Sequence, residues 1–121
     1  MEKVESMRAL SIRQPYAELI LRGEKKIEYR SRPTNIRERV YIYASQTPGN
    51  AKDFEDMAAT IGDFPTGVIV GTVEIINCTV EQRECHWHLA RPERLAHPIK
   101  PDNHPQPAWF YPFRLKEPVR K

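Results

Sequence analysis

Hydrophobic and polar positions alternate in several short segments of this chain and follow a helical spacing in two others. Alternation with a period of two is typical of half-buried strands, whereas apolar residues three and four positions apart indicate one face of a helix. Proline, glycine and asparagine residues separate these segments. The pattern predicts strands over residues 7–12, 25–31, 39–45, 67–77 and 109–115, and helices over residues 15–22 and 50–60.

The segment that joins the first predicted helix to the following strand is the most informative part of the chain. Pro15 fits the first position of a helix, where its missing N–H costs nothing. Tyr16, Leu19 and Ile20 then fall on one helical face. Gly23 can adopt the left-handed conformation that commonly ends a helix. The pattern therefore predicts a short helix that turns sharply into a strand.

This next strand carries charges of both signs on one face. Ile27 and Tyr29 point to one side of it, whereas Lys26, Glu28 and Arg30 point to the other. Glu28 and Arg30 lie two positions apart, which is near enough for both to line one pocket. A charged strand face beside a short helix predicts a functional site in the cleft between them.

The longest apolar stretch, residues 67–77, predicts a strand in the middle of the fold, because both of its faces are apolar as far as Val73. Gly71 within it indicates a bulge or the close approach of another backbone segment. Residues 79–96 give a mixed signal in which we expect a short helix. Residues 97–107 contain four prolines, which predicts an irregular loop.

Together these elements predict an α+β fold, a small mixed β-barrel of about five to six strands with two or three short helices. Pro112 lies within the last predicted strand and indicates an edge position or a break there. A length of 121 residues suits one domain over residues 1–121 with one core.

Composition excludes several classes of protein. Hydrophobic residues make up 40% of the chain and charged residues 29%, which is typical of a globular rather than a disordered chain. No apolar run approaches the ~20 residues of a membrane span, and residues 1–8 lack the apolar core of a signal peptide. We therefore expect a cytoplasmic location without membrane contact. The net charge of +3 permits contact with phosphates without indicating a strongly cationic surface.

Cys85, His86 and His88 offer three metal-ligating side chains within four residues. A structural zinc site needs four convergent ligands, so we expect no metal at this segment. Two cysteines in a chain without an export signal are expected to stay reduced. The sequence contains no nucleotide-binding glycine loop. We expect no cofactor.

Four motifs in the first two thirds of the chain recur in one known family. They are Gln14-Pro15-Tyr16-Ala17, Gly23-Glu24-Lys25, Ile27-Glu28-Tyr29-Arg30 and Tyr41-Ile42-Tyr43-Ala44-Ser45. In this order they closely resemble the ASCH domain, the activating signal cointegrator homology region, which is built on a PUA-like β-barrel. The resemblance covers residues 8–78, and after them the aromatic strand 109–115 also fits. It implies a PUA-like fold and a link to RNA.

The resemblance also bears on catalysis. In one branch of the family, small amidohydrolases that act on acetylated cytidine, a lysine and a threonine of this strand are catalytic, and a glutamate assists them. Lys25 aligns with that lysine. Glu28, however, occupies the position of the threonine, so the hydroxyl nucleophile of that branch is missing here.

We predict that the cleft between the first helix and the following strand binds RNA or a nucleotide. In this hypothesis basic and hydroxyl side chains hold phosphate and a tyrosine stacks on a base. Glu74 either faces solvent or points into the pocket to pair with Lys25 or Arg30. The predicted ligand-binding residues are Arg13, Lys25, Glu28, Arg30, Tyr43, Ser45 and Glu74.

Two further classes of function stay open at this point. A hydrolase acting on a modified nucleoside or on RNA would use Lys25 and Glu28 as an acid–base pair around a water molecule, with Arg30 stabilising negative charge. A protein-interaction module of the coactivator type would instead need a large exposed apolar patch. The sequence does not indicate an oligomeric state.

Overall fold

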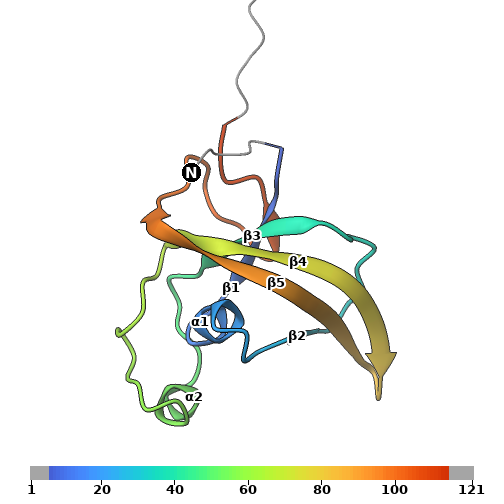
Figure 1. Ribbon diagram of the computed structural model, residues 1–121, viewed down its shortest axis with the longest axis horizontal. Coiled ribbons are helices and arrows are strands. Elements are labelled where there is room, and N and C mark those ends of the chain that lie inside the picture. The colour runs from blue at the N-terminus through green and yellow to red at the C-terminus, as the bar shows by residue number, and fades with distance from the viewer. Residues whose placement is uncertain (1–5, 115–121) are drawn as a thin grey trace, which may run out of the picture.

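One curved sheet and two short helices make up the part of the chain that the computed structural model describes, residues 6–114. Figure 1 shows the two longest strands crossing the molecule, with the first helix beneath them and the second helix further from the sheet. The strands are β1 (Ala9–Ile12), β2 (Ile27–Arg30), β3 (Arg39–Ala44), β4 (Val68–Glu81), β5 (Glu84–Ile99) and β6 (Trp109–Phe110), and the helices are α1 (Tyr16–Leu21) and α2 (Ala51–Glu55).

The six strands form a single mixed sheet in the order β2-β5-β4-β3-β1-β6. Strands β1 and β3 run parallel, and the other neighbouring pairs run antiparallel. The predicted α+β class, strand number and pair of short helices are confirmed. The sheet is not closed into a barrel, because within the described residues no ladder joins the edge strands β2 and β6.

The long hairpin of β4 and β5 corrects the prediction for residues 79–96, which form no helix. The hairpin turns at Gln82 and Arg83, which both have positive φ angles, 49° and 66°. Two residues of this conformation make the turn that best fits the twist of a hairpin. The buried positions Cys85, Trp87 and Leu89 then alternate along β5, and this period-two pattern is the signal that the mixed composition hides.

Strand β5 contains two prolines and extends to Ile99, although the prolines of residues 97–107 predicted a loop from residue 97. Bulges explain how the two prolines fit into the strand. The register of β4 and β5 shifts around Pro92 and Pro98, so neither proline interrupts a regular ladder. Arg91, directly before Pro92, has a φ of 51°. Opposite these bulges lies Gly71. A Cβ atom at Gly71 would lie 2.4 Å from the carbonyl oxygen of Glu93, which confirms the predicted close approach of another backbone segment.

Strands β1 and β3 are covered on both faces. Because successive side chains of a strand point to opposite faces, these strands contribute residues to two separate groups in the core. One group faces α1, which packs against β3, β4 and β5. The other group lies on the opposite face with the residues that follow β5. The first group includes Leu10, Ile12, Ile20, Val40 and Ile42, and the second includes Ala9, Tyr41, Tyr43, Phe110 and Phe113. Tyr41 is fully buried in this second group, so its ring cannot stack on a bound base.

Helix α2 and strand β6 fall furthest short of their predicted lengths, whereas β1, α1 and β2 lose only one or two residues at an end. Helix α2 stops at Glu55 rather than near residue 60, because Phe54 is its single buried residue and Ala58 adopts a φ of 58°. Strand β6 ends at Phe110, and Pro112, which lacks an N–H, follows it. The last residue of the predicted strand, residue 115, lies outside the described part of the chain.

Two buried polar side chains, Gln14 and Glu18, hold helix α1 in place against the rest of the fold. Gln14 accepts a hydrogen bond from the backbone N–H of Glu18 and donates one to the carbonyl of Pro65. Glu18, 7% exposed, accepts two hydrogen bonds from the guanidinium of Arg94 in β5, at 2.8 and 2.9 Å, and one from Arg22 at 2.7 Å. The Arg94 hydrogen bonds are the main cause that lowers the pKa of Glu18.

This lowered pKa predicts a dependence of stability on pH. The charged Glu18 stabilises the fold above the ordinary carboxyl pKa of 4.5, and this contribution is lost as pH falls through the lowered value. We expect Glu18→Gln to lower the free energy of unfolding at pH 7 by about 1–2 kcal/mol, because Arg94 and Arg22 stay partly hydrated. The variant should also lose less stability between pH 7 and pH 3 than the wild type.

Urea denaturation at both pH values measures these effects. Glu24→Gln is the matched control, because its exposed carboxylate makes only a 3.9 Å ion pair with Arg22. Equal losses of stability on acidification in the wild type and in Glu18→Gln would contradict the assignment.

Candidate functional site

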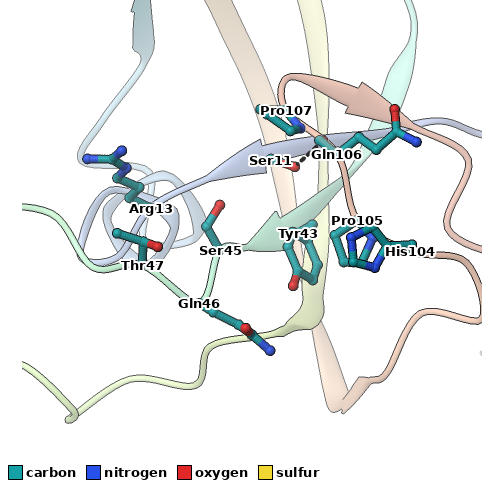
Figure 2. Close-up of a pocket in the computed structure, with 10 residues that line it drawn as sticks. All are labelled: Ser11, Arg13, Tyr43, Ser45, Gln46, Thr47, His104, Pro105, Gln106 and Pro107. Atoms are coloured by element: carbon teal, nitrogen blue, oxygen red, sulfur yellow. Dashed lines mark hydrogen bonds between the residues drawn. The ribbon is translucent and has the colours of Figure 1, made fainter.

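A pocket of ≈ 430 Å³ opens where the parallel strands β1 and β3 end. Figure 2 shows residues from both strand ends on one side of this pocket and a loop between β5 and β6 on the other. The carboxyl ends of parallel neighbours meet at one edge of a sheet, so the side chains that follow them converge. The pocket is lined by Ser11, Arg13, Tyr43, Ser45, Gln46, Thr47, His104, Pro105, Gln106 and Pro107.

Three residues predicted from the sequence meet in this pocket: Arg13, Tyr43 and Ser45. The backbone N–H of Ser45 donates to the carbonyl of Ile12, 2.9 Å away, which fixes the two strand ends side by side. Because this N–H already has a partner, the Ser45 hydroxyl is the group that can reach a ligand. In Figure 2, Ser45 lies between Arg13 and Tyr43.

The proline-containing loop between β5 and β6 forms the other side of the pocket. Its prolines predicted an irregular loop, but the sequence did not indicate that this loop lies at the site. Ser11 holds it there: its hydroxyl donates to the carbonyl of Gln106 at 2.8 Å, and its backbone N–H donates to the carbonyl of Ala108 at 2.9 Å. The sequence reasoning therefore missed Ser11, Gln46, Thr47 and the residues of this loop. The pairing of β1 with β6 brings Ser11 and the loop together, and Gln46 and Thr47 follow the end of β3; no local pattern reveals that these segments meet.

The charge of the pocket favours an anion. Arg13 is exposed, and its guanidinium makes no hydrogen bond or ion pair with the described residues. His104 adds an imidazole, and among the described residues no carboxylate lines the pocket. The hydroxyl of Tyr43 also lies here, and burial raises its pKa, so it stays a neutral hydrogen-bond donor at pH 7. This set of donors can hold a phosphate or carboxylate group.

Next to the pocket, three predicted residues form an ion cluster, which we define as Lys25, Glu28 and Arg30. Glu28 is 9% exposed and lies between the two cations. Its Oε1 is 3.6 Å from Nζ of Lys25, and its Oε2 accepts a hydrogen bond of 2.7 Å from Nε of Arg30. The charged face of β2 therefore points inward, while Tyr29 on the opposite face is 51% exposed.

Arg30 connects the ion cluster to the pocket. Its guanidinium donates to the carbonyl oxygen of Ser11 at 3.0 Å and lies over the ring of Trp87, with 5.4 Å to the ring centroid. Trp87 in turn stacks on Trp109 of β6, with centroids 5.8 Å apart. These contacts join β2 and β5 to β1 and β6, across the gap that the backbone ladder leaves open.

Glu74 lies elsewhere. It pairs with Arg91 at 2.6 Å and with Arg39 at 3.3 Å, and its side chain is 31% exposed. It therefore contacts neither Lys25 nor Arg30, and it does not line the pocket. Arg39 is its register partner on β3, a pairing that follows from the sheet and not from spacing along the chain. Glu74 thus faces solvent and does not point into the pocket.

The segment from Cys85 to His88 does not converge on one point. Along β5 the side chains of Cys85 and Trp87 are buried, and the alternating His86 and His88 face the other side. His86 contacts the carboxylates of Glu81 and Glu84. Among the described residues, no three His, Cys, Asp or Glu side chains are grouped as metal ligands, and both cysteines are free thiols. Within the same residues, no helix has the length and apolar character to cross a membrane.

Comparison with known proteins gives a consistent assignment. The ASCH domain model matches residues 10–111 of this chain. Activating signal cointegrator 1 of Homo sapiens is 31% identical over 85 residues, which are 61% of this chain and 15% of that protein. The Mus musculus protein of the same name matches with the same values. The chain thus corresponds to a small part of these relatives.

Solved structures with the same fold support this assignment. The crystal structure of ASCH from Zymomonas mobilis superposes with a TM-score of 0.61 at 12% identity, over 89% of this chain and 88% of that one. A point mutant of that protein gives the same score at 14% identity, over 88% of each chain. At such identities the likeness shows the fold alone. Because the domain model covers most of the chain, we conclude that this chain belongs to the ASCH domain family.

Proposed function

We propose that this ASCH domain binds RNA or a nucleotide in the pocket at the ends of β1 and β3. The observation that carries the proposal is the meeting of Arg13, Tyr43 and Ser45 in a pocket that no carboxylate of residues 6–114 lines. Arg13 supplies an unpaired positive charge for a phosphate, and the hydroxyl groups supply hydrogen bonds. The volume falls within the range of about 300–1,000 Å³ typical of small-ligand sites.

The ion cluster supports the pocket rather than contacting the ligand in this proposal. The Lys25 and Arg30 side chains are 17% and 23% exposed, and both already pair with Glu28. A phosphate would have to compete with a buried carboxylate for them, whereas no carboxylate in the described part of the chain pairs with Arg13. The cluster instead fixes the position of Ser11, whose carbonyl accepts a hydrogen bond from Arg30.

A hydrolase and a protein-interaction module have weaker support. The close pair of Lys25 and Glu28 is the observation that favours a hydrolase, which would use them as acid and base. Large exposed apolar side chains, which a protein-interaction module needs, come from four separate segments of the described chain. They are Tyr29, Ile61, Ile76, Val80 and Tyr111.

Removal of the unpaired charge tests the binding site. We expect Arg13→Ala to weaken the affinity for a single-stranded RNA of ten nucleotides by about tenfold, because one charge-assisted contact to phosphate is lost. The dependence of log K on log salt should become shallower by about 0.7, the value for one phosphate contact to a single strand. Fluorescence anisotropy at several salt concentrations measures both quantities.

The control for this experiment is Arg83→Asn at the tip of the β4–β5 hairpin, far from the pocket. It removes the same charge, and asparagine tolerates the positive φ of 66° at this position. The control should bind like the wild type. Wild-type binding no tighter than millimolar, or equal binding by Arg13→Ala, would refute the proposal.

Glu28→Gln separates a supporting role from a catalytic one. The substitution leaves two largely buried cations without their carboxylate, so we expect a loss of about 2–3 kcal/mol in the free energy of unfolding. In a binding module, the RNA affinity of the folded variant stays within about twofold. In a hydrolase, turnover would fall by about 10²–10⁴-fold with affinity retained.

Thermal melting, RNA titration and chromatography of acetylated cytidine and of RNA after incubation distinguish these results. Glu38→Gln is the control, because its carboxylate makes an exposed ion pair with Arg8. Product formed by the wild type and lost in Glu28→Gln would establish the hydrolase in place of the simple binding module. An unchanged melting temperature would remove Glu28 from its supporting role.

A further inference from the structure

A second hollow lies beside the pocket, along the same proline-containing loop. It has a volume of ≈ 340 Å³ and shares four lining residues with the pocket: Tyr43, Gln46, His104 and Pro105. Because these four residues line both hollows, the two hollows are direct neighbours, and we refer to them together as the groove. We call the hollow that contains Arg13 the first hollow and the other one the second hollow. The remaining lining residues of the second hollow are Gly67, Lys100, Pro101, Asp102 and Asn103.

The loop that forms one wall of the second hollow is held in place by hydrogen bonds. The backbone N–H groups of Asp102 and Asn103 both donate to the carbonyl of Pro112, at 2.8 and 3.0 Å. The side-chain amide of Asn103 donates to the carbonyl of Tyr111 at 2.7 Å. A wall fixed in this way loses little conformational entropy when a ligand binds.

A glycine leaves room for a neighbouring side chain in the second hollow. Gly67 has a φ of 74°, and a Cβ atom here would lie 3.2 Å from Cγ of Gln46. The absence of a side chain keeps room beside Gln46, which lines both hollows. An amide that can donate and accept is suited to the edge of a nucleic-acid base.

Positive charge lies in both parts of the groove. Arg13 lines the first hollow, and Lys100, an exposed residue, lines the second. In Figure 2, Arg13 lies at the opposite end of the first hollow from His104 and Pro105, where the second hollow begins. Of the described residues, Asp102 alone contributes a carboxylate to the groove, and this carboxylate accepts a hydrogen bond from the backbone N–H of Arg114. Each hollow therefore has its own cation for a phosphate.

From this arrangement we infer that the groove holds two consecutive nucleotides of a single strand, with one nucleotide in each hollow. The inference rests on the proposed function and names its ligand as single-stranded RNA rather than a mononucleotide. Arg13 contacts the phosphate in the first hollow, and Lys100 contacts the phosphate in the second. His104, exposed where the two hollows meet, stacks on a base. The proline-containing loop then serves as the wall that both nucleotides share.

The test compares two ligands, uridine monophosphate and the 5′-phosphorylated dinucleotide of uridine, by calorimetry or ligand-observed NMR. We expect the dinucleotide to bind about tenfold more tightly than the monophosphate to the wild type. Lys100→Ala should weaken dinucleotide binding about fivefold, the upper range for an exposed ion pair, and leave the monophosphate within about twofold. Arg13→Ala should weaken both ligands. Lys100→Arg should retain dinucleotide affinity.

The outcomes separate this inference from the proposed function. Equal affinities for the two ligands, or a Lys100→Ala variant that binds the dinucleotide like the wild type, would overturn the inference, while continued dependence on Arg13 would leave the proposed function standing. Loss of the Arg13 dependence as well would overturn both. Arg83→Asn again serves as the charge control, and thermal melting of every variant verifies that it is folded.

Discussion

The contact of Arg30 with the carbonyl of Ser11 is the interaction on which the site most depends. In the order of the sheet, β2 and β1 are separated by three other strands, and no backbone ladder joins the two ends within the described residues. The sheet nevertheless curls far enough for an arginine of β2 to reach β1 at 3.0 Å. The tryptophan pair of β5 and β6 crosses the same gap. In a closed barrel, backbone hydrogen bonds would join the two edges of the sheet. Here polar and stacking contacts between side chains join them.

The side-chain contacts between the two edges of the sheet explain why the charged groups of the ion cluster are buried there. A guanidinium reaches further than an apolar side chain and can satisfy a carbonyl, a carboxylate and an aromatic face at once. Arg30 does all three, with Ser11, Glu28 and Trp87. Burying such a group costs desolvation energy, which its partners offset only if the geometry is good. The gain is that the pocket wall and the strand face are held in one arrangement.

Local patterns predicted most of the elements but not how they meet. The short helix, the left-handed Gly23 with a φ of 76° and the charged strand follow from residue type and spacing. The clustering of Glu28 with Arg30 could also be anticipated from their shared face. Strand β5 could not, because Pro92 and Pro98 resemble strand breakers until the bulges that accommodate them are known. The same limit applies to the candidate site: Glu74 was hard to place, because its partner Arg91 becomes its neighbour only through the register of β4 and β5.

Gly71 limits how this sequence can vary. Its missing side chain lets the backbone of β5 and the side chain of Leu21 approach to where a Cβ atom would stand, at 2.4 and 2.5 Å. The close approach of β5 to β4 at this point therefore requires a residue without a side chain. Any related chain with a larger residue at the equivalent position must reshape the bulge in the facing strand, because the atom of Glu93 in the way belongs to the backbone, whereas the end of the Leu21 side chain can turn aside. An alignment that places alanine or valine there would thus mark a relative whose β5 bulge has a different shape.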